Sequence, residues 1–145
     1  MDFLTSMKIS ASAMTANRKR VATINSNIAN AQTTRTAEGG PYRKKVVVLG
    51  SEPARDSFSD ILEGEIDAQA QEVHATDVIS LDDPPIPKYE PHHPDANEKG
   101  YVMYPNINTM AEMADLISAQ RAYEANVNAM NVSKSMALKA LELGR

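Results

Sequence analysis

Residues 108–143 read NTMAEMADLISAQRAYEANVNAMNVSKSMALKALEL and contain neither proline nor glycine, whereas Pro105 precedes the stretch and Gly144 follows it. Proline breaks helices and glycine ends them, so the stretch predicts one long helix. Thr109 and Glu112 have the spacing of a capping box, in which both side chains bind backbone N–H groups. At about 1.5 Å per residue, this helix is roughly 50 Å long. Its predicted apolar stripe comprises Met113, Leu116, Ile117, Tyr123, Val127, Met130, Ala137 and Leu141.

The N-terminal segment predicts a second helix, because residues 1–38 are also free of proline and glycine. Apolar residues recur there with heptad spacing, and Arg18 and Asn25 occupy two positions of the stripe. We expect this helix at residues 4–31. Matching stripes in two long terminal helices predict an antiparallel coiled coil, with apolar surface left for partners to cover. The stripe comprises Leu4, Met7, Ala11, Met14, Val21 and Ile28, and Ile24 and Ala31 widen it.

The middle of the chain predicts turns and extended structure, since all eight prolines lie there. Tyr42–Leu49 is rich in β-branched residues and predicts a strand, with Val73–Leu81 as its candidate partner. Pro84–Pro94 is expected to be extended and irregular, and Phe58–Leu62 is a candidate short helix. The fold class is therefore mainly α with a small β-containing middle. The predicted segments are a helical one at 1–34, a Pro/Gly-rich middle at 35–105 with 50–72 unassigned, and a helical one at 106–145.

Composition excludes several classes of structure. With five Tyr, two Phe and no Trp among 145 residues, the chain cannot build a core of large rings, and the absence of cysteine excludes disulfides and thiolate sites. No uninterrupted apolar run is longer than Val46–Leu49, so no direct membrane insertion is expected. The N-terminus lacks the compact apolar region of a Sec signal peptide, and we expect any export to use another route.

Charge is distributed unevenly along the chain. Residues 1–45 hold eight Lys or Arg against two acidic residues, whereas residues 51–98 hold thirteen Asp or Glu against two basic residues. This split fits either self-association between unlike surfaces or two solvated surfaces.

No motif indicates catalysis, and we expect no enzymatic activity, cofactor or small-molecule substrate. His92 and His93 are neighbours that rarely point the same way, and no third ligand has metal-site spacing, so no metal site is expected. The basic clusters at 18–20 and 43–45 lack interleaved aromatic residues, and the net charge is −4. Nucleic-acid binding is therefore not expected.

Asparagine is unusually frequent in the predicted helices, although its amide competes with the backbone and makes it a mediocre helix former. One interpretation is that these residues are surface positions or caps, and that Asn30 helps to end its helix. The other is that amides in a coiled-coil seam fix its register, because a slipped pairing leaves them unsatisfied. The residues are Asn17, Asn25, Asn27, Asn30, Asn126, Asn128 and Asn131.

Residues 26–33, SNIANAQT, closely resemble the signature at the end of the N-terminal helix in bacterial flagellar rod and hook proteins. Further stretches at 41–44, 89–108 and 112–144 are similar to the C-type proximal rod proteins of the flagellar basal body. The resemblance covers residues 4–49 and 73–145. Ser26 stands where the signature often has a further Asn.

The resemblance implies a non-enzymatic structural subunit of the rod, the drive shaft that crosses the periplasm and serves motility. It implies export through the flagellar type III apparatus without a cleaved signal peptide, followed by helical assembly with itself and other rod subunits through terminal helices that are poorly ordered in free monomers. A soluble coiled-coil adaptor or regulatory module that binds a partner helix is the alternative, which predicts stable helices in an isolated dimer. The predicted assembly interface comprises Leu4, Met7, Ala11, Met14, Val21, Ile24, Asn27, Ile28, Asn30, Met113, Leu116, Ile117, Tyr123, Asn126, Val127, Met130 and Leu141.

Overall fold

A computed structural model describes residues 3–53 and 71–143, which form two long helices and two small antiparallel sheets. The prediction of a mainly helical chain with a β-containing middle is therefore confirmed. The candidate helix at Phe58–Leu62 lies outside the described residues. The elements are α1 (Phe3–Ala29), β1 (Lys45–Pro53), β2 (Gln71–Ser80), β3 (Ile86–Tyr89), β4 (Tyr101–Tyr104) and α3 (Thr109–Leu143).

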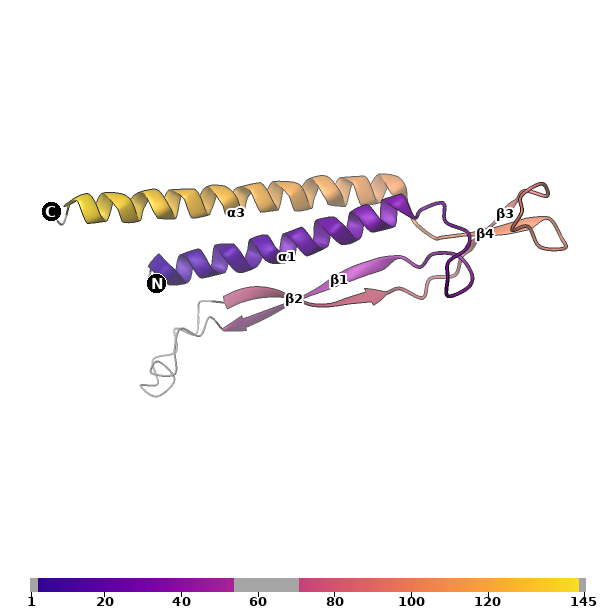
Figure 1. Cartoon of the computed structure of the whole chain (residues 1–145), viewed down its shortest axis with the longest axis horizontal. Helices are drawn as coiled ribbons and strands as arrows, with labels where there is room; N and C mark the ends of the chain where they lie inside the picture. Colours follow the sequence, from indigo (N-terminus) through magenta and orange to yellow (C-terminus); the bar gives the residue numbers. More distant parts are fainter. Residues whose placement is uncertain (1–2, 54–70, 144–145) are drawn as a thin grey trace.

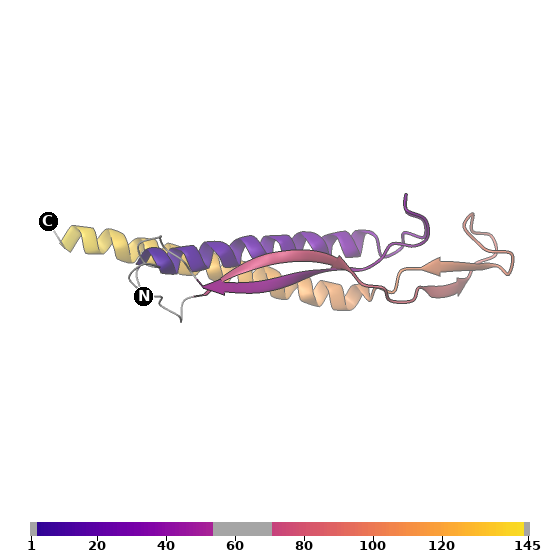
Figure 2. The ribbon, with the colours of Figure 1, turned by 90° about the horizontal axis from the view of Figure 1, so that it is seen from below.

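The helices and the β1–β2 ribbon are stacked as three layers, with α1 in the middle (Figure 1). α1 contacts α3 on one side and both strands of the ribbon on the other. The helices run in opposite directions, so both chain termini lie at one end, where α3 extends past the start of α1 (Figure 1). Seen at 90°, the ribbon follows the helices along most of α1 (Figure 2).

The ribbon pairs the two segments that the sequence indicated. β1 and β2 are antiparallel, from Lys45↔Ser80 to Pro53↔Gln71, with an irregularity after Val48 that leaves Thr76 without a partner. A Cβ added to Gly50 would lie 2.6 Å from the Thr76 hydroxyl, so the close approach requires glycine there. The prediction of a strand pair is confirmed, and the pairing reaches further along the chain than expected.

A second hairpin, formed by β3, β4 and the loop 90–100, is called the tip hairpin here. It projects beyond the helices at the end opposite the termini (Figure 1). The expectation that Pro84–Pro94 is irregular was wrong for β3, which pairs with β4 from Ile86↔Tyr104 to Tyr89↔Tyr101. Pro87 is tolerated because both strands of a two-stranded sheet are edge strands, where a missing N–H costs little.

The predicted capping box of Thr109 and Glu112 at the start of α3 was wrong. Asn108 is the cap, because its Oδ1 accepts hydrogen bonds from the backbone N–H groups of Met110 and Ala111 at 3.1 and 3.2 Å. Asn is among the preferred residues at this position. Glu112 does not reach back to the helix start, since its side chain points into the protein and makes other bonds.

The apolar core is small. Across the described ranges, the buried apolar side chains are Ala16, Ile24, Val102, Pro105 and Ala119. Ala16 and Ala119 contribute one small residue from each helix, which lets helices approach closely. Most large apolar side chains of α3 remain exposed. Packing within one chain therefore buries little apolar surface, and polar contacts must position the elements.

Gly100, the one glycine of the tip hairpin, is predicted to be required at its position. Its φ is +78°, and an added Cβ would lie 2.9 Å from Cε2 of Tyr89. We expect Gly100→Ala to destabilise the hairpin by more than the roughly 1–2 kcal/mol of left-handed strain alone. Gly39→Ala is the control, because Gly39 has a φ of +90° but no atom near the added Cβ. Hydrogen exchange of the local amides measures both, and equal losses would contradict the steric argument.

Candidate assembly site

The end of α1 holds a buried asparagine whose side-chain amide makes two hydrogen bonds to a strand backbone, as a neighbouring strand would. Asn27 is 1% exposed. Its Nδ2 donates to the backbone O of Lys45 at 2.8 Å, and its Oδ1 accepts from the backbone N–H of Lys45 at 2.9 Å. One amide therefore satisfies both backbone groups of the first residue of β1. This pairing fixes where the ribbon leaves the helix.

Glu112, on the first turn of α3, binds the same asparagine. It is 2% exposed, and its Oε2 accepts from Nδ2 of Asn27 at 3.0 Å. Its Oε1 lies 2.7 Å from the ammonium nitrogen of Lys44. A buried carboxylate is costly unless it is paired and hydrogen-bonded, and here both oxygens have partners. Glu112 thus joins the start of α3 to the end of α1 and to Lys44, the residue that precedes β1.

Tyr42 and Ser26 complete this arrangement, which we call the buried polar junction (Ser26, Asn27, Tyr42, Lys44, Glu112 and the backbone of Lys45). The Tyr42 hydroxyl donates to Oδ1 of Asn27 at 3.2 Å, and the Ser26 hydroxyl lies 3.2 Å from the Tyr42 oxygen. Within the described residues, no buried side-chain nitrogen or oxygen lacks a hydrogen-bond partner. A fully satisfied polar network of this kind specifies one arrangement of its elements.

The other asparagines have separate roles. Asn30 follows α1 and donates from Nδ2 to the backbone O of Ser26 at 2.9 Å, while its Oδ1 accepts from the Thr33 hydroxyl at 3.1 Å. These bonds support the interpretation that Asn30 helps to end its helix. Asn126 is half-buried and donates to the backbone O of Ala122, on its own helix, at 2.8 Å. Its amide contacts α3 rather than an amide across the helix pair.

The predicted interface residues fall into three groups by exposure. Ile24 and Asn27 are buried, and Leu4 lies in α1, although its side chain is outside the described part of the chain. The exposed residues are Ala11, Met113, Ile117, Tyr123 and Leu141. The half-buried residues are Met7, Met14, Val21, Ile28, Asn30, Leu116, Asn126, Val127 and Met130.

The exposed apolar surface of α3 is larger than the sequence stripe indicated. Met110, Met113 and Ile117 are 76%, 46% and 51% exposed, and their spacing places them on one side of the first turns. The predicted stripe begins at Met113 and omits Met110, which lies between the two residues of the predicted capping box. A second exposed group lies toward the end of the helix and comprises Val132, Met136, Leu138, Leu141 and Leu143.

Four residues of the buried polar junction were also missed as site residues, namely Ser26, Tyr42, Lys44 and Glu112. Tyr42 and Lys44 belong to the stretch 41–44 that carried part of the resemblance, but no spacing linked them to Asn27. For Glu112 the sequence does contain a signal, namely its capping-box spacing from Thr109 at the start of a long helix. That signal suggested a helix cap, which is a local role, whereas the actual partners come from distant parts of the chain.

A network of ionisable groups stiffens the tip hairpin. The Lys88 ammonium lies 2.7 Å from Oε1 of Glu90, and the Tyr104 hydroxyl donates to Oε2 of Glu90 at 2.9 Å. The hydrogen bond from Lys88, followed by that from Tyr104, lowers the pKa of Glu90. The same bonds to Glu90 raise the pKa of Lys88 and the pKa of Tyr104.

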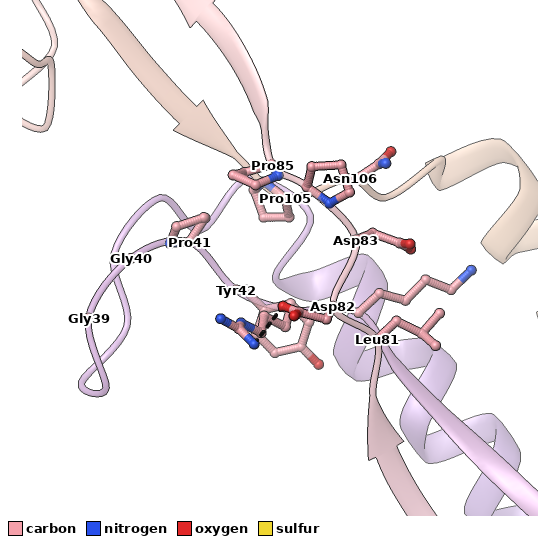
Figure 3. Close-up of a pocket in the computed structure, with 13 residues that line it drawn as sticks. Gly39, Gly40, Pro41, Tyr42, Leu81, Asp82, Asp83, Pro85, Pro105 and Asn106 are labelled. Carbon is pink, nitrogen blue, oxygen red and sulfur yellow. Dashed lines mark ion pairs between the residues drawn. The ribbon is translucent and has the colours of Figure 1, made fainter.

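Between the tip hairpin and the rest of the molecule lies a groove of about 230 Å³, which we call the waist groove (Figure 3). Prolines 41, 84, 85 and 105 line it, and an ion pair of 2.8 Å joins Arg43 to Asp82 at its edge.

The described residues include no group of three or more side chains that could hold a metal ion. His93 instead accepts a hydrogen bond at Nδ1 from the backbone N–H of Asp95 at 3.1 Å. In the same ranges, no helix has the length and apolarity needed to cross a lipid bilayer.

Comparison with known proteins gives two family matches. Residues 7–35 match the family of flagella basal body rod proteins, and residues 98–143 match the C-terminal family of flagellar basal body rod FlgEFG proteins. The flagellar basal-body rod protein FlgC of Bacillus subtilis is 44% identical, with 97% of each chain covered. FlgC of Borreliella burgdorferi is 38% identical over 99% of this chain and 98% of its own. FlgC of Salmonella typhimurium is 36% identical over the full length of both.

Removing the central amide is predicted to destabilise the fold. Asn27→Ala leaves both backbone groups of Lys45 without this partner, and we expect the free energy of unfolding to fall by about 1–3 kcal/mol. The matched control is Asn25→Ala, an exposed position on the same helix, which should change it by no more than about 0.5 kcal/mol. Urea titrations followed by circular dichroism give both values. Similar losses in the two variants would exclude a special role for Asn27.

The tip hairpin is predicted to loosen at both extremes of pH. Because the pKa of Glu90 is lowered, its contribution is present above the ordinary carboxyl pKa and is lost as pH falls through the lowered value. Because the pKa values of Lys88 and Tyr104 are raised, their contributions are present below their ordinary values and are lost as pH rises through the raised ones. Amide chemical shifts of β3 and β4 recorded across pH test this. Glu90→Gln should weaken both transitions, and an unchanged profile would refute the assignment.

Proposed function

We propose that this chain, which belongs to the FlgC group of flagellar basal-body rod proteins and is a structural subunit of that rod, assembles through its terminal helices, with the exposed apolar residues of α3 as the main contact surface. The observation that carries this proposal is the exposure of large apolar side chains on α3, from Met110 at 76% to Leu143 at 88%. An apolar surface of this kind marks a site of contact with another protein, so α3 has surface available for contacts with other rod subunits.

The exposed face of α3 is the first part of the proposed interface. Met110, Met113 and Ile117 present a short apolar stripe, and burying such side chains contributes roughly 25 cal/mol for each Å² removed from water. Apolar residues at spacings of three and four positions fit against another helix. The end of α3 extends past the start of α1 (Figure 1), and Leu141 and Leu143, the last exposed residues of the second group, lie at this end, where a neighbouring subunit can cover them.

Within one subunit, we infer that α1 and α3 form an antiparallel coiled coil. The helices lie side by side in opposite directions, and an ion pair of 4.0 Å joins Arg20 to Asp115. Half-buried seam residues on both helices support this inference: Met7, Met14 and Val21 on α1, and Leu116, Val127 and Met130 on α3. The buried polar junction fixes the two helices against each other at one end.

Delivery and location are also part of the proposal. We infer that the flagellar type III export apparatus delivers the chain without a cleaved signal peptide, and that the rod it joins crosses the periplasm. A chain without cysteine cannot form mispaired disulfides in an oxidising compartment. A small apolar core makes the isolated chain easy to unfold, which suits passage through a narrow channel. Helical assembly with copies of itself and with other rod subunits then buries the helix faces.

The free monomer is predicted to hold its helix ends loosely. The half-buried Met7 and Met14 and the exposed end of α3 lack the packing that protects amides. Hydrogen exchange on dilute monomer should show weaker protection at the start of α1 and at the end of α3 than around the buried polar junction, and stronger protection of both ends in basal bodies. Strong protection in an isolated dimer would instead favour a soluble coiled-coil module.

The decisive test of the function is complementation of a deletion strain. Deletion should abolish motility and every outer flagellar structure without affecting growth, and the unaltered chain should restore them. Ile117→Glu places a charge on the exposed stripe and should fail to restore motility, although the purified variant keeps its helicity. Gln120→Glu is the matched control on the same helix and should restore motility. A deletion strain that still builds hooks would refute the proposed function, whereas full rescue by Ile117→Glu would refute only the proposed interface.

A further inference from the structure

The tip hairpin is attached to the rest of the molecule in an unusual way. Within the described residues, neither β3 nor β4 contacts α1, α3 or the β1–β2 ribbon. The chain enters through residues 81–85 and leaves through residues 105–108, and residues of both segments line the waist groove (Figure 3). Packing between secondary-structure elements therefore does not set the angle between the hairpin and the helices.

A loop from the end of α1 reaches the tip hairpin instead. We call residues 30–42 the strap. Its two arms are joined by backbone hydrogen bonds from Tyr42 N–H to Thr33 O at 3.1 Å and from Thr36 N–H to Gly40 O at 2.9 Å. Its base is fixed to the helix end because Nδ2 of Asn30 donates to the backbone O of Ser26 at 2.9 Å, while Oδ1 of Asn30 accepts from the Thr33 hydroxyl. The strap is thus a closed loop that moves with α1.

The strap holds the tip hairpin through one carboxylate. The Thr34 hydroxyl donates to Oδ2 of Asp95 at 2.8 Å, and Nη1 of Arg35 lies 3.9 Å from Oδ1 of the same residue. The Asp95 side chain is 27% exposed, whereas that of Arg35 is 80% exposed. An exposed ion pair contributes little, so the hydrogen bond from Thr34 is the stronger of the two contacts.

The loop of the tip hairpin that carries Asp95 is held by further contacts within the hairpin. A single contact between the strap and Asp95 can therefore orient the whole tip hairpin. His93 accepts from the backbone N–H of Asp95, and its ring packs edge-on against Tyr104, with centroids 6.5 Å apart. Asn97 accepts from the backbone N–H groups of Lys99 and Tyr101 through Oδ1 at 3.0 and 2.9 Å. The loop that carries Asp95 is therefore fastened to the start of β4.

Val102 shows that the strap side of the hairpin is a packed surface. It is 0% exposed, whereas its neighbours Tyr101 and Met103 are each 41% exposed. Val102 lines a groove of about 380 Å³ together with Thr34, Pro41 and other residues of the strap and the Asp95 loop. One face of the hairpin is thus turned toward the strap, and the opposite face carries exposed aromatic side chains.

We infer that the strap and Asp95 form a latch that holds the tip hairpin at one angle to the helices. Through this latch, the position of α1 is coupled to the position of the tip, across a waist where the connecting chain alone would allow movement. This inference concerns the orientation of the tip hairpin and holds whichever faces of α1 and α3 contact neighbouring subunits.

Because the chain has no cysteine, pairs of introduced cysteines can be spin-labelled specifically. His92→Cys with Arg121→Cys reports the distance from the tip hairpin to α3, and Asn25→Cys with Lys134→Cys reports the distance between the helices. Pulsed electron paramagnetic resonance gives both distance distributions. The test variants are Asp95→Ala and Thr34→Val, and the matched control is Glu98→Ala, which removes an exposed acidic side chain from the same loop.

The latch predicts one narrow tip-to-α3 distribution in the parent protein and in Glu98→Ala. Asp95→Ala and Thr34→Val should lose this narrow distribution, while the helix-to-helix distribution stays unchanged. Retention of the narrow distribution in both test variants would overturn the inference. If Asp95→Ala also alters the helix-to-helix distance, Thr34→Val decides alone, because it replaces only a hydroxyl by a methyl group.

Discussion

The fold depends on the amide of Asn27, because that one side chain touches all three layers. It belongs to α1, pairs with both backbone groups of the first residue of β1, and donates to Glu112 at the start of α3. The apolar core is too small to select among arrangements of the layers. Hydrogen bonds have strict distances and angles, so the buried polar junction supplies the specificity that large apolar side chains usually supply.

The sequence predicted those parts of the fold that depend on local rules. Long stretches without proline and glycine located both helices, and β-branched residues located the strands of the ribbon. It failed where distant segments decide the outcome. Glu112 has the spacing of a capping residue, but its partners Asn27 and Lys44 are far away in the chain. The β3 strand was missed because Pro87 counts against a strand everywhere except at an edge.

The candidate site shows the same division. Helical periodicity found Met113 and Ile117, which are exposed on α3, and also Ile24, which is buried within the chain. Periodicity identifies an apolar position but does not tell whether the same chain or a neighbouring subunit covers it, because apolar side chains are buried in the same way within a subunit and between subunits. Asn27 is unusual in the sequence because asparagine is a mediocre helix former. Its partner, however, is the backbone of a strand, which no helical pattern reveals.

The hydrogen bond between Asn27 and Glu112 spans 85 positions of the chain. Contacts between residues so far apart in sequence form late, because the intervening loop must close first. A chain that emerges from a ribosome or a narrow channel with its N-terminus first can build α1 early, but it cannot complete the junction until α3 has followed. The three layers therefore close only on a chain delivered almost to its end, and the order of synthesis itself delays folding.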